Sequence, residues 1–206
     1  MTVPLSIGYI GYHSVLRHFC SYLPSIVLKI AFKHALLLCV GTVLLVACSP
    51  KFNWRQVQGN DAPYSVLLPA KPSTFSREVD LNGVKVKMTM TATEIDDTVF
   101  AVGSAKVSDA RQASAALQAM KTALVKNISG SITSETDSDI TDGRQDSARS
   151  ITLEVAGAAE NNSQPKVLFA HLQSKGDYIY QVIVIGPQKT VTRENVEMFM
   201  ESFKAS

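Results

Sequence analysis

Cysteine is scarce in this sequence and is absent from most of it. The three cysteines, Cys20, Cys39 and Cys48, all lie within the first 48 of the 206 residues. The chain beyond Cys48 therefore cannot form a disulfide framework, a zinc–thiolate site or a cysteine nucleophile. Histidine is almost as scarce there, because three of the four histidines precede Cys48. His171 is left as the only candidate for an imidazole general base in this region.

Acidic residues are missing from the first 47 positions, which contain three basic ones. Because the whole chain has 20 lysines and arginines and 18 acidic residues, 17 basic and 18 acidic residues remain after position 47. This balance gives no basis for nucleic-acid binding, which requires a dense basic patch. The phosphate-loop patterns GxxxxGK[ST] and GxGxxG do not occur, and we expect no cofactor.

The N-terminal region lacks an apolar run long enough to span a membrane. The uncharged run at 35–47 has 13 residues, whereas a spanning helix needs about 20. Lys29, Lys33 and His34 precede this run. A short apolar run with basic residues before it is typical of a secretory signal peptide. We therefore expect residues 1–47 to be a signal peptide that is removed from the mature protein.

The apolar run ends at Leu45, Val46, Ala47 and Cys48, which are an aliphatic residue, a tolerant position, a small residue and a cysteine. These four residues resemble the lipobox of bacterial lipoprotein precursors. The resemblance implies that the Cys48 thiol is lipidated, that cleavage makes Cys48 the N-terminus, and that acyl chains such as palmitate hold the protein on a membrane. The alternative interpretation is a buried cysteine in a core helix.

Two further expectations concern this N-terminal region. Ser49 follows the cysteine in place of the aspartate that retains related lipoproteins of enteric-type bacteria at the inner membrane. The resemblance therefore implies an outer-membrane location facing the periplasm. A segment of 47 residues is longer than the usual 15–30 or so. Translation from Val27 or Leu28 would make 1–27 an artefact, and a second hydrophobic segment is the alternative.

The segment 48–63 is expected to be an irregular tether. Pro50, Gly59 and Pro63 within it discourage regular secondary structure. Its two aromatic residues, Phe52 and Trp54, could contact the lipid interface or pack on the domain, and we favour packing.

Residues 64–206 carry the pattern of one α+β domain. The pair Asn82-Gly83 predicts a hairpin, because both residue types tolerate positive φ. The run at 178–185 is apolar on both faces and should be a central strand. The strands are predicted at 64–68, 74–81, 84–94, 98–107, 131–136, 147–156, 166–174 and 178–185.

Two segments carry apolar residues at helical spacing. The helix predicted at 109–128 has Asp109 or Ser108 as its cap, and the helix predicted at 192–204 has Thr192. Their apolar stripes consist of Ala113, Leu117, Met120, Leu124 and Ile128 in the first, and Val196, Phe199, Met200 and Phe203 in the second. The expected fold is a mostly antiparallel β-sheet with both amphipathic helices packed on it.

The order of four short motifs resembles the PsbP-like domains of small bacterial envelope lipoproteins. These motifs are Tyr64-Ser-Val-Leu-Leu-Pro-Ala-Lys-Pro72, Asp142-Gly143, Gly176-Asp-Tyr178 opening a strand that ends at Gly186, and Phe199-Met-Glu-Ser-Phe203. The resemblance implies an α+β fold of this kind. It implies no catalytic residues, because fold alone does not determine function.

The sequence contains no recognisable catalytic or metal-binding motif. His171 is expected to be a structural or surface histidine, because no Ser-His-Asp arrangement can be read from the chain. The acidic stretch 135–146 fails the EF-hand pattern, since position 6 would be Asp142 and position 12 Ala148. We interpret it as a flexible solvated loop, with a weak adventitious cation site as the alternative, and predict no metal site.

The sequence favours a non-enzymatic, lipid-anchored envelope protein that binds a small ligand or an envelope protein. A structural subunit of an envelope complex is one alternative, and a hydrolase using His171 is another. An exposed apolar patch would favour the subunit. A deep pocket with a perturbed His171 would favour the hydrolase, and a pocket away from His171 would favour ligand binding.

Overall fold

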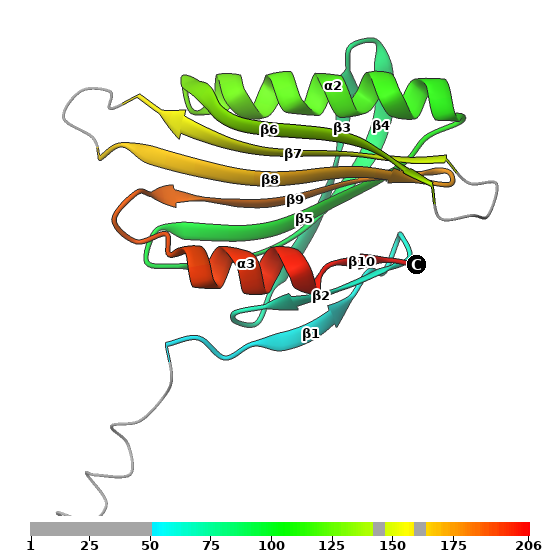
Figure 1. Ribbon diagram of the computed structural model, residues 1–206. Helices are drawn as coiled ribbons and strands as arrows, with labels where there is room; N and C mark the ends of the chain where they lie inside the picture. The colour runs from blue at the N-terminus through cyan, green and yellow to red at the C-terminus, as the bar shows by residue number, and fades with distance from the viewer. Residues whose placement is uncertain (1–50, 142–146, 159–163) are drawn as a thin grey trace, which may run out of the picture. The chain divides into compact units, whose positions relative to one another are not determined.

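A seven-stranded antiparallel sheet forms the centre of the fold, in the strand order β3-β4-β5-β9-β8-β7-β6 (Figure 1). The structure is a computed structural model that describes residues 51–141, 147–158 and 164–206. The predicted signal peptide, residues 1–47, and Cys48 lie outside the described residues. The strands are β3 (Ser73–Leu81), β4 (Val84–Ile95), β5 (Thr98–Lys106), β6 (Gly130–Thr141), β7 (Ser147–Gly157), β8 (Lys166–Lys175) and β9 (Tyr178–Pro187).

Tight turns connect neighbouring strands at the positions that the sequence indicates. Asn82 and Gly83 join β3 to β4 with φ angles of 58° and 90°. Asp96 and Asp97 join β4 to β5 in the same left-handed region, with φ angles of 49° and 60°. Such a two-residue connection fixes the register of a hairpin, because its twist matches that of the flanking strands.

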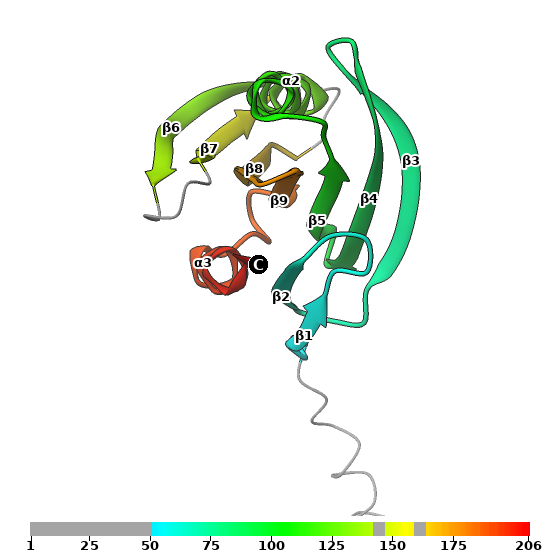
Figure 2. The same ribbon diagram turned by 90° about the vertical axis from the view of Figure 1, so that its right-hand side faces the viewer.

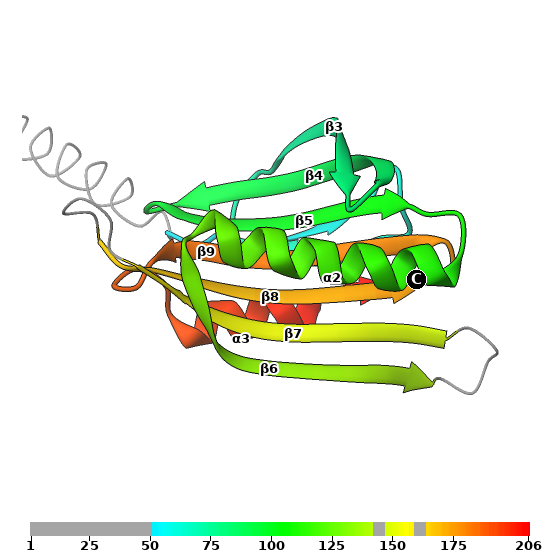
Figure 3. The same ribbon diagram turned by 90° about the horizontal axis from the view of Figure 1, so that it is seen from above.

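Helix α2 (Ala110–Asn127) lies across one face of the sheet (Figure 3). Asp109 caps it by accepting a hydrogen bond from the Gln112 amide at 2.9 Å, which satisfies one of the free N–H groups of the first turn. All five residues of the apolar stripe predicted for this helix are buried. They pack with side chains of β7, β8 and β9, including Leu153, Leu168 and Ile179, in the larger of two apolar clusters.

The opposite face of the sheet is covered by helix α3 and a small three-stranded sheet (Figure 2). Helix α3 spans Arg193–Ser202, and the small sheet contains β1 (Arg55–Gln58), β2 (Tyr64–Leu68) and β10 (Lys204–Ala205). The second apolar cluster lies here and contains Phe100, Val182 and Phe199. β9 lies in the middle of the sheet and contributes side chains to both clusters, which explains why both of its faces are apolar.

A hydroxyl group joins α3 to the small sheet. Ser202 Oγ donates to the Phe199 carbonyl oxygen at 2.7 Å and accepts from the Leu67 amide at 2.9 Å. The partners Leu67 and Ser202 are 135 residues apart in sequence. Directly after the helix, β10 pairs antiparallel with β2, so the small sheet contains segments from both ends of the domain.

The predicted fold class is confirmed in its coarser form, because the described residues form a mostly antiparallel sheet with two helices. The expectation of irregular structure throughout 48–63 is wrong, since β1 pairs with β2 over four residues. Phe52 and Trp54 pack on the domain, with ring centres 6.4 and 6.1 Å from that of Phe100. These contacts order the segment, and propensity alone did not indicate them.

Two further boundaries differ from the predictions. The acidic stretch 135–146 is not a loop over its first part, because β6 continues to Thr141 and pairs with β7. The closing helix ends at Ser202 rather than 204, and Phe203 is extended at φ −70° and ψ 130°, which leads the chain into β10.

A bulge interrupts β6 between Ile132 and Ser134. Within the described ranges, no helix has the length and apolar character needed to cross a bilayer.

Candidate functional site

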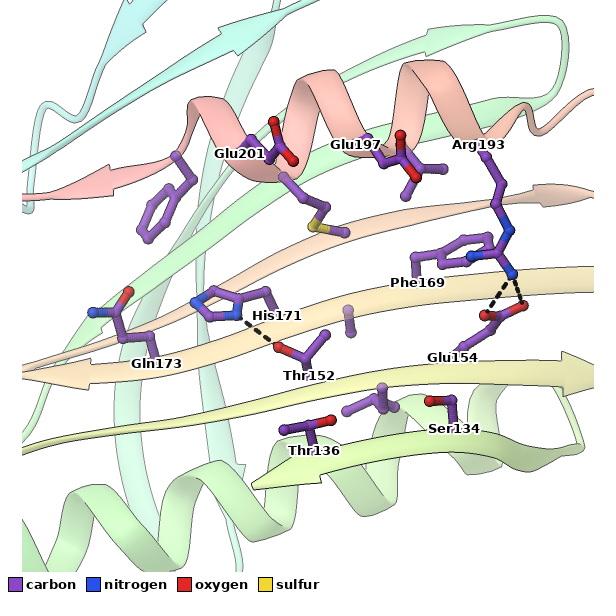
Figure 4. Close-up of a pocket in the computed structure, with 15 residues that line it drawn as sticks. Ser134, Thr136, Thr152, Glu154, Phe169, His171, Gln173, Arg193, Glu197 and Glu201 are labelled. Atoms are coloured by element: carbon purple, nitrogen blue, oxygen red, sulfur yellow. Dashed lines mark hydrogen bonds and ion pairs between the residues drawn. The ribbon is translucent and has the colours of Figure 1, made fainter. Parts of the chain in front are cut away.

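A groove of about 440 Å³ separates α3 from the strands β6, β7 and β8 (Figure 4). It lies on the face of the sheet opposite α2, where α3 leaves the outer strands uncovered. Its floor is made of strand side chains and its wall is the side of α3 that faces them.

The register of three antiparallel strands aligns the side chains of the groove floor. Thr136 of β6 is opposite Thr152 of β7, which is opposite His171 of β8, so these three residues form a row across the sheet. Two residues further along, Ser134, Glu154 and Phe169 form a second row. Because side chains alternate between the two faces of a strand, both rows point away from α2 and into the groove.

The wall combines charged and apolar side chains of α3. Arg193, Glu197 and Glu201 are four residues apart and therefore lie along one side of the helix. Val196 and Met200 line the groove from the adjacent stripe, which also faces the second apolar cluster. The groove thus has hydroxyl groups on its floor, carboxylates on its wall and apolar atoms at their junction.

Arg193 closes one end of the groove. Its Nη2 donates to both carboxylate oxygens of Glu154, at 3.0 and 3.2 Å, and its guanidinium carbon lies 5.5 Å from the centre of the Phe169 ring. The Arg193 side chain is 71% exposed, so we expect this ion pair to add little to stability. Its main effect is to neutralise Glu154 and to occupy the face of Phe169.

His171 lies on the groove floor, next to the apolar junction. Its Nδ1 shares a hydrogen bond with Thr152 Oγ1 at 3.1 Å, and its ring centre is 6.4 Å from that of Phe203. Burial lowers the pKa of His171, and a hydrogen bond to Gln173 acts in the opposite direction. The imidazole is therefore neutral at pH 7, and neither of these hydrogen-bond partners is a carboxylate.

The acidic side chains of β6 lie on the other face of the sheet from the groove. Asp137 accepts two hydrogen bonds from Arg149, at 2.6 and 3.0 Å, and this partner lowers the pKa of Asp137. Glu135 accepts from Lys121 of α2 at 2.7 Å. Two carboxylates in the described part of the acidic stretch, those of Glu135 and Asp137, are therefore paired, and the described residues contain no group of three side chains arranged for a metal ion.

The predicted sites are distributed unevenly over the structure. The predicted lipidation site Cys48 and the predicted lipobox residues Leu45, Val46 and Ala47 lie outside the described residues. His171 is described and lines the groove, although we expected a structural or surface role. Sequence reasoning missed the polar side of α3. Its signal was the spacing 193, 197 and 201, which places three charges on one helix side.

Comparison with known proteins adds no relative to this description. The chain matches no model of a known protein family and no curated protein sequence. The groove and the N-terminal sequence pattern are therefore the features of this chain that bear on its function.

Proposed function

We propose that this chain is a lipid-anchored protein of the bacterial cell envelope whose groove binds a ligand without catalysing a reaction. The observation that supports binding most directly is the groove itself, in which hydroxyl, imidazole, carboxylate and apolar groups from four elements face one space. Its volume of about 440 Å³ lies within the range of roughly 300–1,000 Å³ that is usual for small-molecule sites.

The anchoring part of the proposal comes from the sequence. Cys48 would carry the lipid, and the absence of aspartate after it favours the outer membrane, with the domain facing the periplasm. The fold would be PsbP-like, a proposal that rests on the four sequence motifs. An antiparallel sheet with one helix between its strands and another after them is consistent with it.

A hydrolase is the second candidate, because the groove contains a hydroxyl–imidazole pair. Thr152 Oγ1 and His171 Nδ1 are 3.1 Å apart, and burial lowers the pKa of His171, a kind of perturbation that is common at functional sites. Nucleophilic catalysis also needs a third group that orients the base. The partners of His171 among the described residues are Thr152 and Gln173, so these residues supply no acid for such a triad. Binding is therefore the better-supported function.

An accessory subunit without a ligand has less support. The large apolar side chains that are exposed in the described region are Phe75, Ile132 and Met198. They come from β3, β6 and α3, three separate elements, whereas a permanent interface usually presents one contiguous apolar patch.

The binding proposal can be tested by filling the groove. Thr136→Trp would place an indole over the groove floor from an exposed position of β6. Ser138→Trp is the matched control, because Ser138 is also exposed and lies two residues further along the strand, outside the groove lining. The mature protein would be isolated from its native membrane and analysed by native mass spectrometry. We expect a bound small molecule on the wild type and on the control, and none on Thr136→Trp.

Two results would contradict the binding proposal. A wild-type protein without any bound mass, or equal retention in Thr136→Trp, would show that the groove is not the ligand site. His171→Gln separates the second candidate, because without a catalytic role of His171 the species bound to this variant should have the same mass as the species bound to the wild type, even where less of it is retained. A new, larger bound species in that variant would instead indicate an uncleaved substrate.

A further inference from the structure

The groove has an excess of negative charge. Three carboxylates, those of Glu154, Glu197 and Glu201, line it together with one guanidinium, that of Arg193. Arg193 already forms an ion pair with Glu154. Glu197 and Glu201 have no cationic partner within the described part of the chain, and His171 adds no charge at neutral pH. The unbalanced charge of the groove therefore comes from two carboxylates one helical turn apart.

This charge restricts the chemistry of the ligand. Phosphate esters, nucleotides and carboxylic acids would meet like charges on the wall without a free cation to bind, and such contacts are unfavourable. A cationic group would instead form ion pairs with the carboxylates of Glu197 and Glu201. The groove floor can also bind a hydrogen-bond donor of the ligand, because the hydroxyl oxygens of Thr136 and Thr152 accept hydrogen bonds.

The apolar atoms of the groove indicate what the cation is attached to. Val196 and Met200 alternate with the two glutamates along α3, and Phe203 lies at the end of the groove beside His171. A methionine side chain is flexible and adapts to irregular apolar partners. A slender aliphatic stem would contact these atoms while its charged end remains between the carboxylates.

We propose that the groove binds a primary amine on a flexible aliphatic stem, with the ammonium group between Glu197 and Glu201 and the stem against Met200. This inference rests on the proposed binding function and narrows its ligand to one chemical class. Two sources share this chemistry, namely a free diamine and the side chain of a lysine residue. Both present three N–H donors on a compact charge.

The test uses the mature lipidated chain in phosphatidylcholine nanodiscs, which contain no anionic lipid that would bind amines. The probe is dansylcadaverine, and binding is followed by fluorescence anisotropy with empty nanodiscs as the blank. Two analogues with the same fluorophore serve as controls, one ending in a methyl group and one in a carboxylate. Free cadaverine and an end-blocked Gly-Lys-Gly peptide are the competitors that distinguish the two sources.

The decisive variant is Glu197→Gln combined with Glu201→Gln. We expect it to weaken dansylcadaverine binding about 2- to 30-fold, the range for two exposed charge pairs, and to leave the methyl-ended probe unchanged. Glu194→Gln is the matched control, because Glu194 is on the same helix but outside the groove lining. It should leave all binding constants unchanged. Higher salt should weaken only the binding of the amine.

The outcomes separate this inference from the proposed function. If all three probes bind equally, the double variant changes nothing and Thr136→Trp abolishes binding, the groove is a binding site and the amine inference is wrong. If no probe binds, the amine inference is also wrong. Whether the groove is a binding site at all is then decided separately, by the native mass spectrometry of the ligand retained from the membrane. Stronger competition by the peptide would identify a lysine side chain as the ligand, and stronger competition by cadaverine a free amine.

Discussion

Replacing Phe199 by alanine should destabilise the domain more than any change on the exposed side of α3. The Phe199 side chain is 0% exposed, and its ring meets that of Phe100 edge to face at 5.5 Å and 87°. Its burial is worth about 1.5–3 kcal/mol, and the aromatic pair adds about 0.5–1.5 kcal/mol. With the cavity that alanine leaves, the expected loss in the free energy of unfolding is about 3–5 kcal/mol.

Urea unfolding of the protein, followed by tryptophan fluorescence, would measure this loss. Trp54 is the only tryptophan and packs against Phe100 at 6.1 Å, so it reports directly on the second apolar cluster. For a domain of about 150 residues the expected fall in Tm is roughly 6–20 °C. Met198→Ala is the control, because Met198 is 40% exposed and should change stability by at most about 0.5 kcal/mol. A loss below about 1 kcal/mol for Phe199→Ala would refute the packing of α3 described above.

Two further predictions concern His171 and Cys48. Because burial lowers the folded-state pKa of His171, the fold favours the neutral ring, and its contribution to stability is lost as pH falls below about 6.5. His171→Gln should flatten this part of the pH profile of urea unfolding, and an unchanged slope would contradict it. Cys48→Ser should abolish labelling by a fatty-acid probe and leave a slower-migrating precursor. Equal labelling of the variant would exclude Cys48 as the lipidation site.

Local patterns predicted most of the secondary structure. The alternation of β4, the turn at Asn82-Gly83 and the stripe of α2 depend on neighbours in sequence, so their signals are visible without the fold. β1 carried no such signal, because it is an edge strand that pairs with β2 alone among the described strands and residues such as Gly59 and Asn60 after it are turn formers. Its order depends on the contacts of Phe52 and Trp54 with Phe100, which is distant in sequence.

The groove was less accessible to sequence reasoning than the fold. Thr136, Thr152 and His171 meet because two strand registers align them, and a shift of one residue would turn each side chain to the other face. The bulge at Ile132 and Ser134 makes such a register impossible to count from the sequence. The spacing of charged residues indicated the polar side of α3, but it did not indicate which strands this side faces.

The bond between Ser202 and Leu67 has a consequence for the order of folding. Its partners are 135 residues apart, and β10 pairs with β2 over a similar separation, so closing this contact carries a large loop entropy and favours slow folding. A nascent chain without α3 and β10 lacks Val196, Phe199 and Phe203, which complete the second apolar cluster. The domain can therefore complete its second layer only after residues 193–205 have been made. Under the proposed function the chain would be exported, and late closure of this contact would keep the polypeptide unfolded for translocation.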